Sequence, residues 1–352
     1  MVTMKEKKKK KHFLLRFLFT LLIVLGILFG VAFGGLTFLL DGRLNAMQRT
    51  QAYTKKELNV ASEVISYTRL RPVYNLAIFG VDNSGDYTAT DRSDAMKILS
   101  VSPLTRAIKI TSVQRDTLVW IPDPTNDYSK FNHAYWWGGA PLALKTLNMN
   151  LDLDLTRYVT FSFSALEQLV NLVGGVDIYL TQAEVYDMQL RNGTIYYDGD
   201  RVYHLDGSQA MAYCRVRYTD DDYHRMQRQN NVIQAILSNF KGFGFSKQLA
   251  IISDILPYVE TNLSNTEIKL LILSAAICDL NHIDQYQVPE DGYNDINVLS
   301  YGGYSPLYKL RSYSDTIKNL HRFMYGSRNY QVSPQALQIE ENIYATFGPF
   351  SE

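Results

Sequence analysis

The feature that most constrains this chain is a long uncharged stretch near its N-terminus. No Asp, Glu, Lys or Arg occurs from Phe17 to Leu40. A helix of this length, rising about 1.5 Å per residue, is long enough to cross a bilayer core of about 30 Å. We therefore expect a transmembrane helix over residues 17–40, preceded by a short tail over residues 1–16.

The charges of that tail predict how the chain is oriented in the membrane. Residues 1–16 carry six lysines and Arg16 against a single acid, Glu6. Such a positive cluster keeps its side of a membrane in the cytoplasm. The sequence thus predicts a single-pass cell-membrane protein with a cytoplasmic N-terminus and an extracellular remainder. A cleaved secretion signal, with Ala32-Phe33-Gly34 as the cleavage site, is the weaker alternative because the apolar stretch is longer than a signal h-region.

Three glycines in the apolar stretch bear on oligomerisation. Gly26, Gly30 and Gly34 have the small-xxx-small spacing that lets two spanning helices approach closely. This spacing would permit a homodimer through the transmembrane helix. Glycine is common in spanning helices in general, so the spacing alone is weak support.

The charge and cysteine counts exclude several classes of protein. Seven of the 35 basic residues and one of the 35 acidic residues lie in residues 1–16, so the remainder carries 28 and 34. A net charge of −6 argues against binding to nucleic acid, which normally needs a basic surface. The two cysteines, Cys214 and Cys278, allow one disulfide or none and exclude a disulfide scaffold.

Hydrophobic patterns divide the extracellular part into three segments. Residues 41–73 read as a partly helical stem, residues 74–325 as the folded domain, and residues 326–352 as a polar tail. Strand patterns at 74–81, 95–101 and 107–113 suggest one edge of a sheet, and residues 122–139 read as a loop. Further along, strands and helices alternate, with strands at 158–163 and 176–180 and helices at 141–149, 164–172, 223–240, 247–256 and 265–280. This alternation predicts a layered α/β domain with a central mixed β-sheet flanked by helices.

Carboxylates near the strand ends are candidate metal ligands. The segment from Gly80 to Asp86 has the glycine spacing of a phosphate loop, but Asp86-Tyr87 replaces the Lys-Ser/Thr pair that such a loop requires. The loop offers acids instead, and Asp94 follows just before the next strand. Oxygen ligands of this kind suit Mg²⁺, although aspartates in turns are more often turn residues only.

Arginines give a stronger signal for an anion site. An extended backbone over residues 213–218 would direct Arg215 and Arg217 to the same side. In the following helix, Arg225, Arg228 and Gln229 share one face, which continues into an apolar stripe and should point into the domain. Arg115 adds a further cation directly after the third predicted strand.

A charged helix face is usually solvated, and Asp220, Asp221 and Asp222 would then neutralise or cap the helix. We favour an anion site, because the inward arginines lack matching inward acids. Buried guanidinium groups need anions, and their forked geometry suits phosphate.

At these residues the chain resembles the LytR-CpsA-Psr family of bacterial cell-envelope phosphotransferases. The resemblance covers about Asn75 to Gln229, with a weaker continuation to about Pro289. The matching segments are NLAIFGVD at 75–82, RSD at 92–94, RDT at 115–117, KFNHAY at 130–135, GGVD at 174–177, LDGSQA at 205–210, RVR at 215–217 and DYHRMQRQ at 222–229. Three positions depart from the family pattern, namely Gln114, the Asn132-His133 pair and Cys214.

The resemblance implies both a reaction and the residues that perform it. The enzyme would move a glycan with one phosphate from a polyprenyl-pyrophosphate carrier to peptidoglycan, the glycan being a teichoic acid, a capsule or another wall polymer. By analogy with the family, the residues sort into three roles. Mg²⁺ would be held by Asp82 and Asp94, the pyrophosphate would be contacted by Arg115, Arg215, Arg217, Arg225 and Gln229, and the candidate catalytic residues are Arg115, Asp222 and Asp94.

The sequence leaves three points open. Either Asp222 or Asp94 would accept the proton of the acceptor hydroxyl. A pyrophosphatase, using water at the same site, is the alternative enzyme. A non-catalytic envelope regulator or receptor that only binds the lipid-linked glycan is the alternative from another class, although binding alone would not need the metal ligands.

Overall fold

The computed structural model describes residues 41–81, 92–190, 194–217, 222–279, 282–290 and 292–351. The chain divides into two compact units, Met1–Ala46 and Met47–Glu352. The first unit is described only over residues 41–46, so the architecture below is that of the second. The transmembrane helix predicted over residues 17–40 lies outside the described residues. Within the described ranges, no helix combines the length and apolarity needed to cross a membrane.

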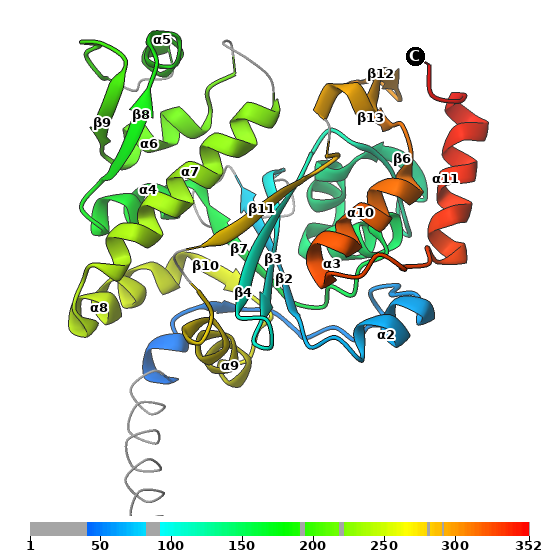
Figure 1. Cartoon of the computed structure of the whole chain (residues 1–352), viewed down its shortest axis with the longest axis horizontal. Coiled ribbons are helices and arrows are strands. Elements are labelled where there is room, and N and C mark those ends of the chain that lie inside the picture. Colours follow the sequence, from blue (N-terminus) through cyan, green and yellow to red (C-terminus); the bar gives the residue numbers. More distant parts are fainter. Residues whose placement is uncertain are drawn as a thin grey trace, which may run out of the picture. The chain divides into compact units, whose positions relative to one another are not determined.

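A seven-stranded mixed sheet forms the centre of the second unit (Figure 1). Three neighbouring pairs in this sheet are parallel and three are antiparallel. In spatial order the strands are β1 (Gln48–Arg49), β10 (Val259–Thr261), β7 (Tyr158–Ser162), β2 (Tyr74–Val81), β3 (Ser93–Ser102), β4 (Ala107–Val113) and β11 (Ile283–Val288). The predicted central mixed sheet is confirmed.

Helices cover both faces of the sheet (Figure 1). One side carries α4 (Phe163–Leu172), α5 (Gln182–Leu190), α6 (Gly207–Cys214), α7 (Asp222–Lys241) and α8 (Phe245–Ile255), with the hairpin of β8 (Val176–Leu180) and β9 (Arg201–Leu205). The other side carries α3 (Phe131–Leu151), α10 (Tyr313–Tyr325) and α11 (Pro334–Phe347). It also carries two hairpins, one formed by β5 (Leu118–Ile121) and β6 (Asp127–Lys130), the other by β12 (Ile296–Tyr301) and β13 (Tyr304–Leu310). The remaining elements are α2 (Ser62–Thr68), α9 (Asn265–Ala276) and two short 3₁₀ turns, Leu256–Tyr258 and Gly292–Asp295.

Successive side chains along the strands point to opposite faces of the sheet, so both faces can be covered. Phe79, Val81 and Ile98 point to the α3 side and are fully buried in its core. Gly80 and Lys97, one position away, point to the opposite side, where α4 and α7 pack. Side chains alternate across a strand, so each strand contributes to two different cores.

Several local predictions are corrected by the structure. The first three predicted strands are internal to the sheet, with β7 on one side and β11 on the other, so they do not form its edge. The predicted loop over residues 122–139 contains β6 and the first turns of α3. Residues that read as a stem also pack on the domain, because β1 pairs with β10 and Leu58 lies in the main core. In the predicted polar tail, α11 buries Ile339 and Ile343.

The sheet has two ends, distinguished by the residues that pair near each of them. Val81, Ser93, Val113 and Ser162 pair near one end, which we call the site edge. At the opposite end, the basal edge, Tyr74 pairs with Val101 and Ser102 pairs with Ala107. The eight residues of β2 connect the two edges, a span of about 25 Å at roughly 3.3 Å per residue.

Candidate active site

Three of the predicted site residues meet at the site edge. Asp94 lies at the start of β3, and its carboxylate forms an ion pair with Arg115, whose guanidinium is largely buried. Arg225 reaches the same residue from α7, since its Nη2 donates a hydrogen bond to the Asp94 carbonyl oxygen over 3.3 Å. Residues separated by about 130 positions in the sequence therefore form one charged cluster.

The turn after β4 fixes the position of Arg115. The Gln114 backbone N–H donates to the Val288 carbonyl on the neighbouring strand, over 3.0 Å. The Gln114 side chain also accepts a hydrogen bond from the Asp116 backbone N–H. The Arg115 carbonyl accepts from Asn132 at the start of α3, over 3.2 Å. These bonds tie the turn to the sheet and to α3, so Arg115 is held on a rigid frame.

Helix α7 carries the buried polar residues that its sequence pattern predicted. Arg225, Arg228 and Gln229 are 3%, 5% and 9% exposed, and the stripe continues into the buried Val232 and Ile236. This confirms that the face points into the domain.

The prediction that these arginines lack matching acids is wrong for Arg228. Its Nε donates to a Glu184 oxygen over 2.9 Å, and its Nη1 donates to the Val216 carbonyl over 3.3 Å. Arg228 therefore joins α7 to α5 and to the segment after α6, as a structural ion pair.

A cavity of about 250 Å³ lies beside the charged cluster, between the sheet and helices α4, α6, α7 and α8. Most of its wall is apolar, formed by residues such as Leu166, Met211, Ile233 and Ile255. Lys97, Arg215 and Gln229 supply its polar and charged wall. The cavity therefore suits a ligand with an apolar body and an anionic end.

The segment with Arg215 and Arg217 is not the predicted strand. Helix α6 starts at a capping box formed by Asp206 and Gln209 and ends with Arg215 as its C-cap. The Arg215 guanidinium lies over the Phe163 ring, 5.0 Å from its centre, at the wall of the cavity. Arg217 is exposed, and its backbone N–H donates to an Asp187 oxygen over 2.6 Å.

The sequence reasoning missed Lys97, which is 4% exposed at the cavity wall. Its Nζ donates to Ser112 Oγ over 2.9 Å and to Asn230 Oδ1 over 2.6 Å. Burial is the main cause that lowers the pKa of Lys97 to about 7, and the nearby Arg225 acts in the same direction. The available signal was a single lysine within the apolar run over residues 95–99.

Cys214 shows how many cations gather near the cavity. Burial raises the pKa of its thiol to about 12, against the opposing effect of four nearby positive charges. These charges are Lys97, Arg225, Arg215 and Arg228. Both Cys214 and Cys278 are free thiols, so the chain has no disulfide between them.

Two predicted acidic residues are not placed by the structure. Asp82 lies outside the described residues, and Asp222 is described only as the first residue of α7. Among the described residues, no group of three or more His, Cys, Asp or Glu side chains is arranged to hold a metal ion. Asp94 offers hard oxygen atoms of the kind that Mg²⁺ prefers, so it fits one position of such a site.

Known proteins share this fold. A Streptococcus agalactiae structure, protein gbs0355, superimposes with a TM-score of 0.62 at 25% identity and covers 78% of this chain and 93% of that one. The structure of TagT bound to LIIa-WTA superimposes with a TM-score of 0.57 at 26% identity and covers 72% and 91%.

Sequence comparison points to the same group of proteins. The polyisoprenyl-teichoic acid–peptidoglycan teichoic acid transferase TagU of Enterococcus faecalis is 32% identical over 207 residues, which are 57% of this chain and 65% of that protein. The chain thus aligns with just under two thirds of that relative. The model of the LytR_cpsA_psr family matches residues 37–313, and the chain belongs to this family.

Proposed function

We propose that this protein transfers a glycan with one phosphate from a polyprenyl-pyrophosphate carrier to peptidoglycan. The observation that carries this proposal is an apolar cavity with Arg215 in its wall, next to a charged cluster. In that cluster Arg115 and Arg225 contact Asp94, whose neighbour Ala95 lines the cavity. A lipid pyrophosphate has the same two parts, an apolar chain and an anionic group. The transferase activity named for the relative TagU supports this choice of substrate and acceptor.

The chemistry requires that charge be neutralised before the acceptor can approach. The acceptor hydroxyl oxygen forms a bond to the glycan-linked phosphorus, while the bond from that phosphorus to the bridging oxygen breaks. The electron pair of the breaking bond stays on the bridging oxygen, which leaves as part of polyprenyl phosphate. Arg115 and Arg225 are preorganised on rigid elements, so they can stabilise this developing charge without reorganising.

The hydroxyl proton needs an acceptor at the site edge. Asp94 and Asp222 are the two candidates for this base. In the structure the Asp94 carboxylate is paired with Arg115. Because of that pairing, Asp94 is better suited to orient the Arg115 guanidinium, and Asp222 is the base that we propose.

We propose that Mg²⁺ is bound by Asp94 together with Asp82. Carboxylate oxygens at the end of a strand are suitable ligands for a hard divalent cation. When bound, the ion would offset part of the pyrophosphate charge. The Asp94 carboxylate would then contact both the Mg²⁺ ion and Arg115.

We also propose that residues 17–40 anchor the protein in the cell membrane, with the N-terminus in the cytoplasm and the domain outside. The uncharged stretch and the basic tail support this placement. The lipid-linked substrate would then share the membrane with the enzyme, which raises their effective concentration.

The test uses the full chain in detergent micelles, incubated with a polyprenyl-pyrophosphate glycan, peptidoglycan fragments and Mg²⁺. Mass spectrometry should show the phosphoglycan on the fragment and polyprenyl phosphate left behind. Free phosphoglycan without a fragment product would indicate the pyrophosphatase. An unchanged lipid-linked glycan, still bound to the protein, would indicate a receptor.

A further inference from the structure

The basal edge of the domain carries an apolar helix with little cover. Helix α9 contains Ile268, Leu270, Leu271, Ile272 and Leu273, yet none of its described side chains is buried. Three of these residues and the C-cap residue Ile277 are 45–55% exposed. A surface helix of a soluble domain normally buries its apolar residues, so the outer apolar side chains of α9 lack cover from the described part of the chain.

Two further exposed side chains extend this surface. Tyr74, at the start of β2, is 48% exposed and lines a small groove together with Leu270. Leu104, in the β3–β4 turn, is 76% exposed. The end of α9 is bonded to this turn, because the Asp279 N–H donates to the Arg106 carbonyl over 3.0 Å. We call the exposed set the basal surface, and its members are Tyr74, Leu104, Leu270, Ile272, Leu273 and Ile277.

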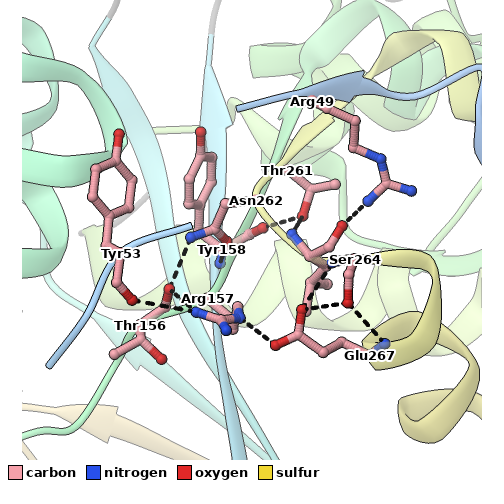
Figure 2. Close-up of polar contacts among 10 residues, drawn as sticks. Arg49, Tyr53, Thr156, Arg157, Tyr158, Thr261, Asn262, Ser264 and Glu267 are labelled. Carbon is pink, nitrogen blue, oxygen red and sulfur yellow. Dashed lines mark hydrogen bonds and ion pairs between the residues drawn. The ribbon is translucent and has the colours of Figure 1, made fainter. Parts of the chain in front are cut away.

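The connections of α9 place it across the end of the sheet that is opposite the site edge (Figure 1). It follows β10 and precedes β11, which are near opposite sides of the sheet. Its first turn is fixed by a capping box between Ser264 and Glu267, and Arg157 pairs with Glu267 over 2.5 Å (Figure 2). The helix is therefore rigidly mounted although its outer face is exposed.

The described N-terminal segment contacts the start of α9 through Arg49. Arg49 donates to the Leu263 carbonyl and, over 2.6 Å, to Asn265 Oδ1. Arg49 lies nine positions after Leu40, where the proposed membrane anchor ends. At no more than about 3.6 Å per residue, this connection spans at most roughly 32 Å. The proposed anchor would therefore hold the first turn of α9 within that distance of the membrane.

We propose that the basal surface docks on the lipid bilayer, with the α9 axis in the membrane plane. This proposal rests on the proposed membrane anchor. An interfacial helix inserts an apolar face at the headgroup boundary, and the exposed apolar side chains of α9 would supply that face. Tyr74 is a residue type enriched at that boundary, and the exposed Arg106 suits anionic headgroups.

Docking fixes the height of the active site. The site edge is one strand length, about 25 Å, from the basal edge. Arg115 would then stand about that far above the headgroups, and the apolar cavity would lie between the arginines and the bilayer. The polyprenyl chain would have to pass along the sheet face to leave its pyrophosphate at the arginines.

The experiment uses the full chain reconstituted in vesicles of phosphatidylglycerol and phosphatidylethanolamine. Cys278→Ser is combined with Leu273→Cys, and the new thiol is labelled with the environment-sensitive dye NBD; the buried Cys214 should stay unlabelled. The matched control combines Cys278→Ser with Val202→Cys, at a position in β9 that is 54% exposed against 45% for Leu273. Figure 1 shows β9 and α9 at opposite ends of the domain.

Doxyl-labelled lipids are the quencher. We expect NBD at position 273 to lose roughly half or more of its emission, because an interfacial face lies about 5–10 Å into the boundary. NBD at position 202 should keep its emission. Equal quenching at both positions, or none at position 273, would overturn the proposal. A change at position 273 that depends on protein density and not on the quencher would mean that a second copy covers α9, and would also overturn it.

Resistance to alkaline extraction is measured first. A chain that is washed off the vesicles would refute the proposed anchor. A chain that stays anchored with an unquenched position 273 refutes the docking alone. The two failures are therefore distinguishable.

Discussion

Replacing Arg228 by methionine tests whether this arginine of α7 stabilises the fold without taking part in the active site. Arg228 and Glu184 are 5% and 14% exposed at the side chain, and their N–O distance is 2.9 Å. At an effective dielectric constant of about 20, the attraction at this distance is about 6 kcal/mol before the desolvation penalty. Breaking a buried pair by removing one partner usually costs about 3–5 kcal/mol.

The lower end of that range applies to this pair. Glu184 also accepts hydrogen bonds from the Thr181 N–H and hydroxyl, over 3.0 and 2.9 Å, so its carboxylate keeps two donors when the arginine is lost. We expect Arg228→Met to lower the free energy of unfolding by about 3 kcal/mol. The double variant Arg228→Met/Glu184→Gln should recover much of this loss, with a coupling energy of about 2 kcal/mol.

Urea unfolding of the full chain in micelles measures the stability change, and transfer to peptidoglycan fragments measures activity. The folded fraction of Arg228→Met should keep its turnover within about threefold of the wild type, since Arg228 is not needed by the substrate. A stability loss below about 1 kcal/mol together with a large loss of turnover would refute the structural role of this arginine.

Three further predictions concern the cavity, a buried lysine and a tight helix contact. Ile233→Trp should raise KM for a long-chain substrate by roughly tenfold, because it fills the apolar cavity, and should leave a short-chain analogue unaffected in the same kinetic assay. Burial lowers the pKa of Lys97 to about 7, whereas the pKa of lysine in the unfolded chain is about 10. Between these two pH values the unfolded chain binds more protons than the folded chain, so the free energy of unfolding rises with pH. Lys97→Met should remove this slope of up to about 1.4 kcal/mol per pH unit, as measured by urea titrations. Gly207→Ala should destabilise by about 1–3 kcal/mol in thermal unfolding, because its Cβ would overlap the Glu167 carbonyl. Gly244→Ala meets no atom and should lose only about 1 kcal/mol or less, because alanine is a poorer N-cap of α8 than glycine.

Local sequence patterns predicted the strands and the buried face of α7. The runs at 74–81 and 107–113 coincide with β2 and β4, since a short apolar run bounded by turn residues specifies a strand without help from distant contacts. The inward face of α7 followed from its 3.6-residue period in the same way.

Predictions that depended on distant partners were wrong or absent. No local pattern shows that Arg228 meets Glu184, which lies 44 residues earlier in the chain. The cavity wall is likewise built from four helices that meet only in the folded domain. The error at Arg215 was avoidable, because Asp206 and Gln209 have the spacing of a capping box and mark the start of a helix.

The measurement that tests the proposed reaction most directly compares wild type, Arg115→Ala and Arg228→Met in the transfer assay with lipid-linked glycan and peptidoglycan fragments. We expect the wild type to leave polyprenyl phosphate and a phosphoglycan on the fragment. Arg115→Ala should reduce turnover by roughly 10²–10³-fold, because it removes a preorganised charge next to Asp94. A loss of less than about tenfold in Arg115→Ala, with the fold intact, would contradict the arginine site as the centre of the reaction.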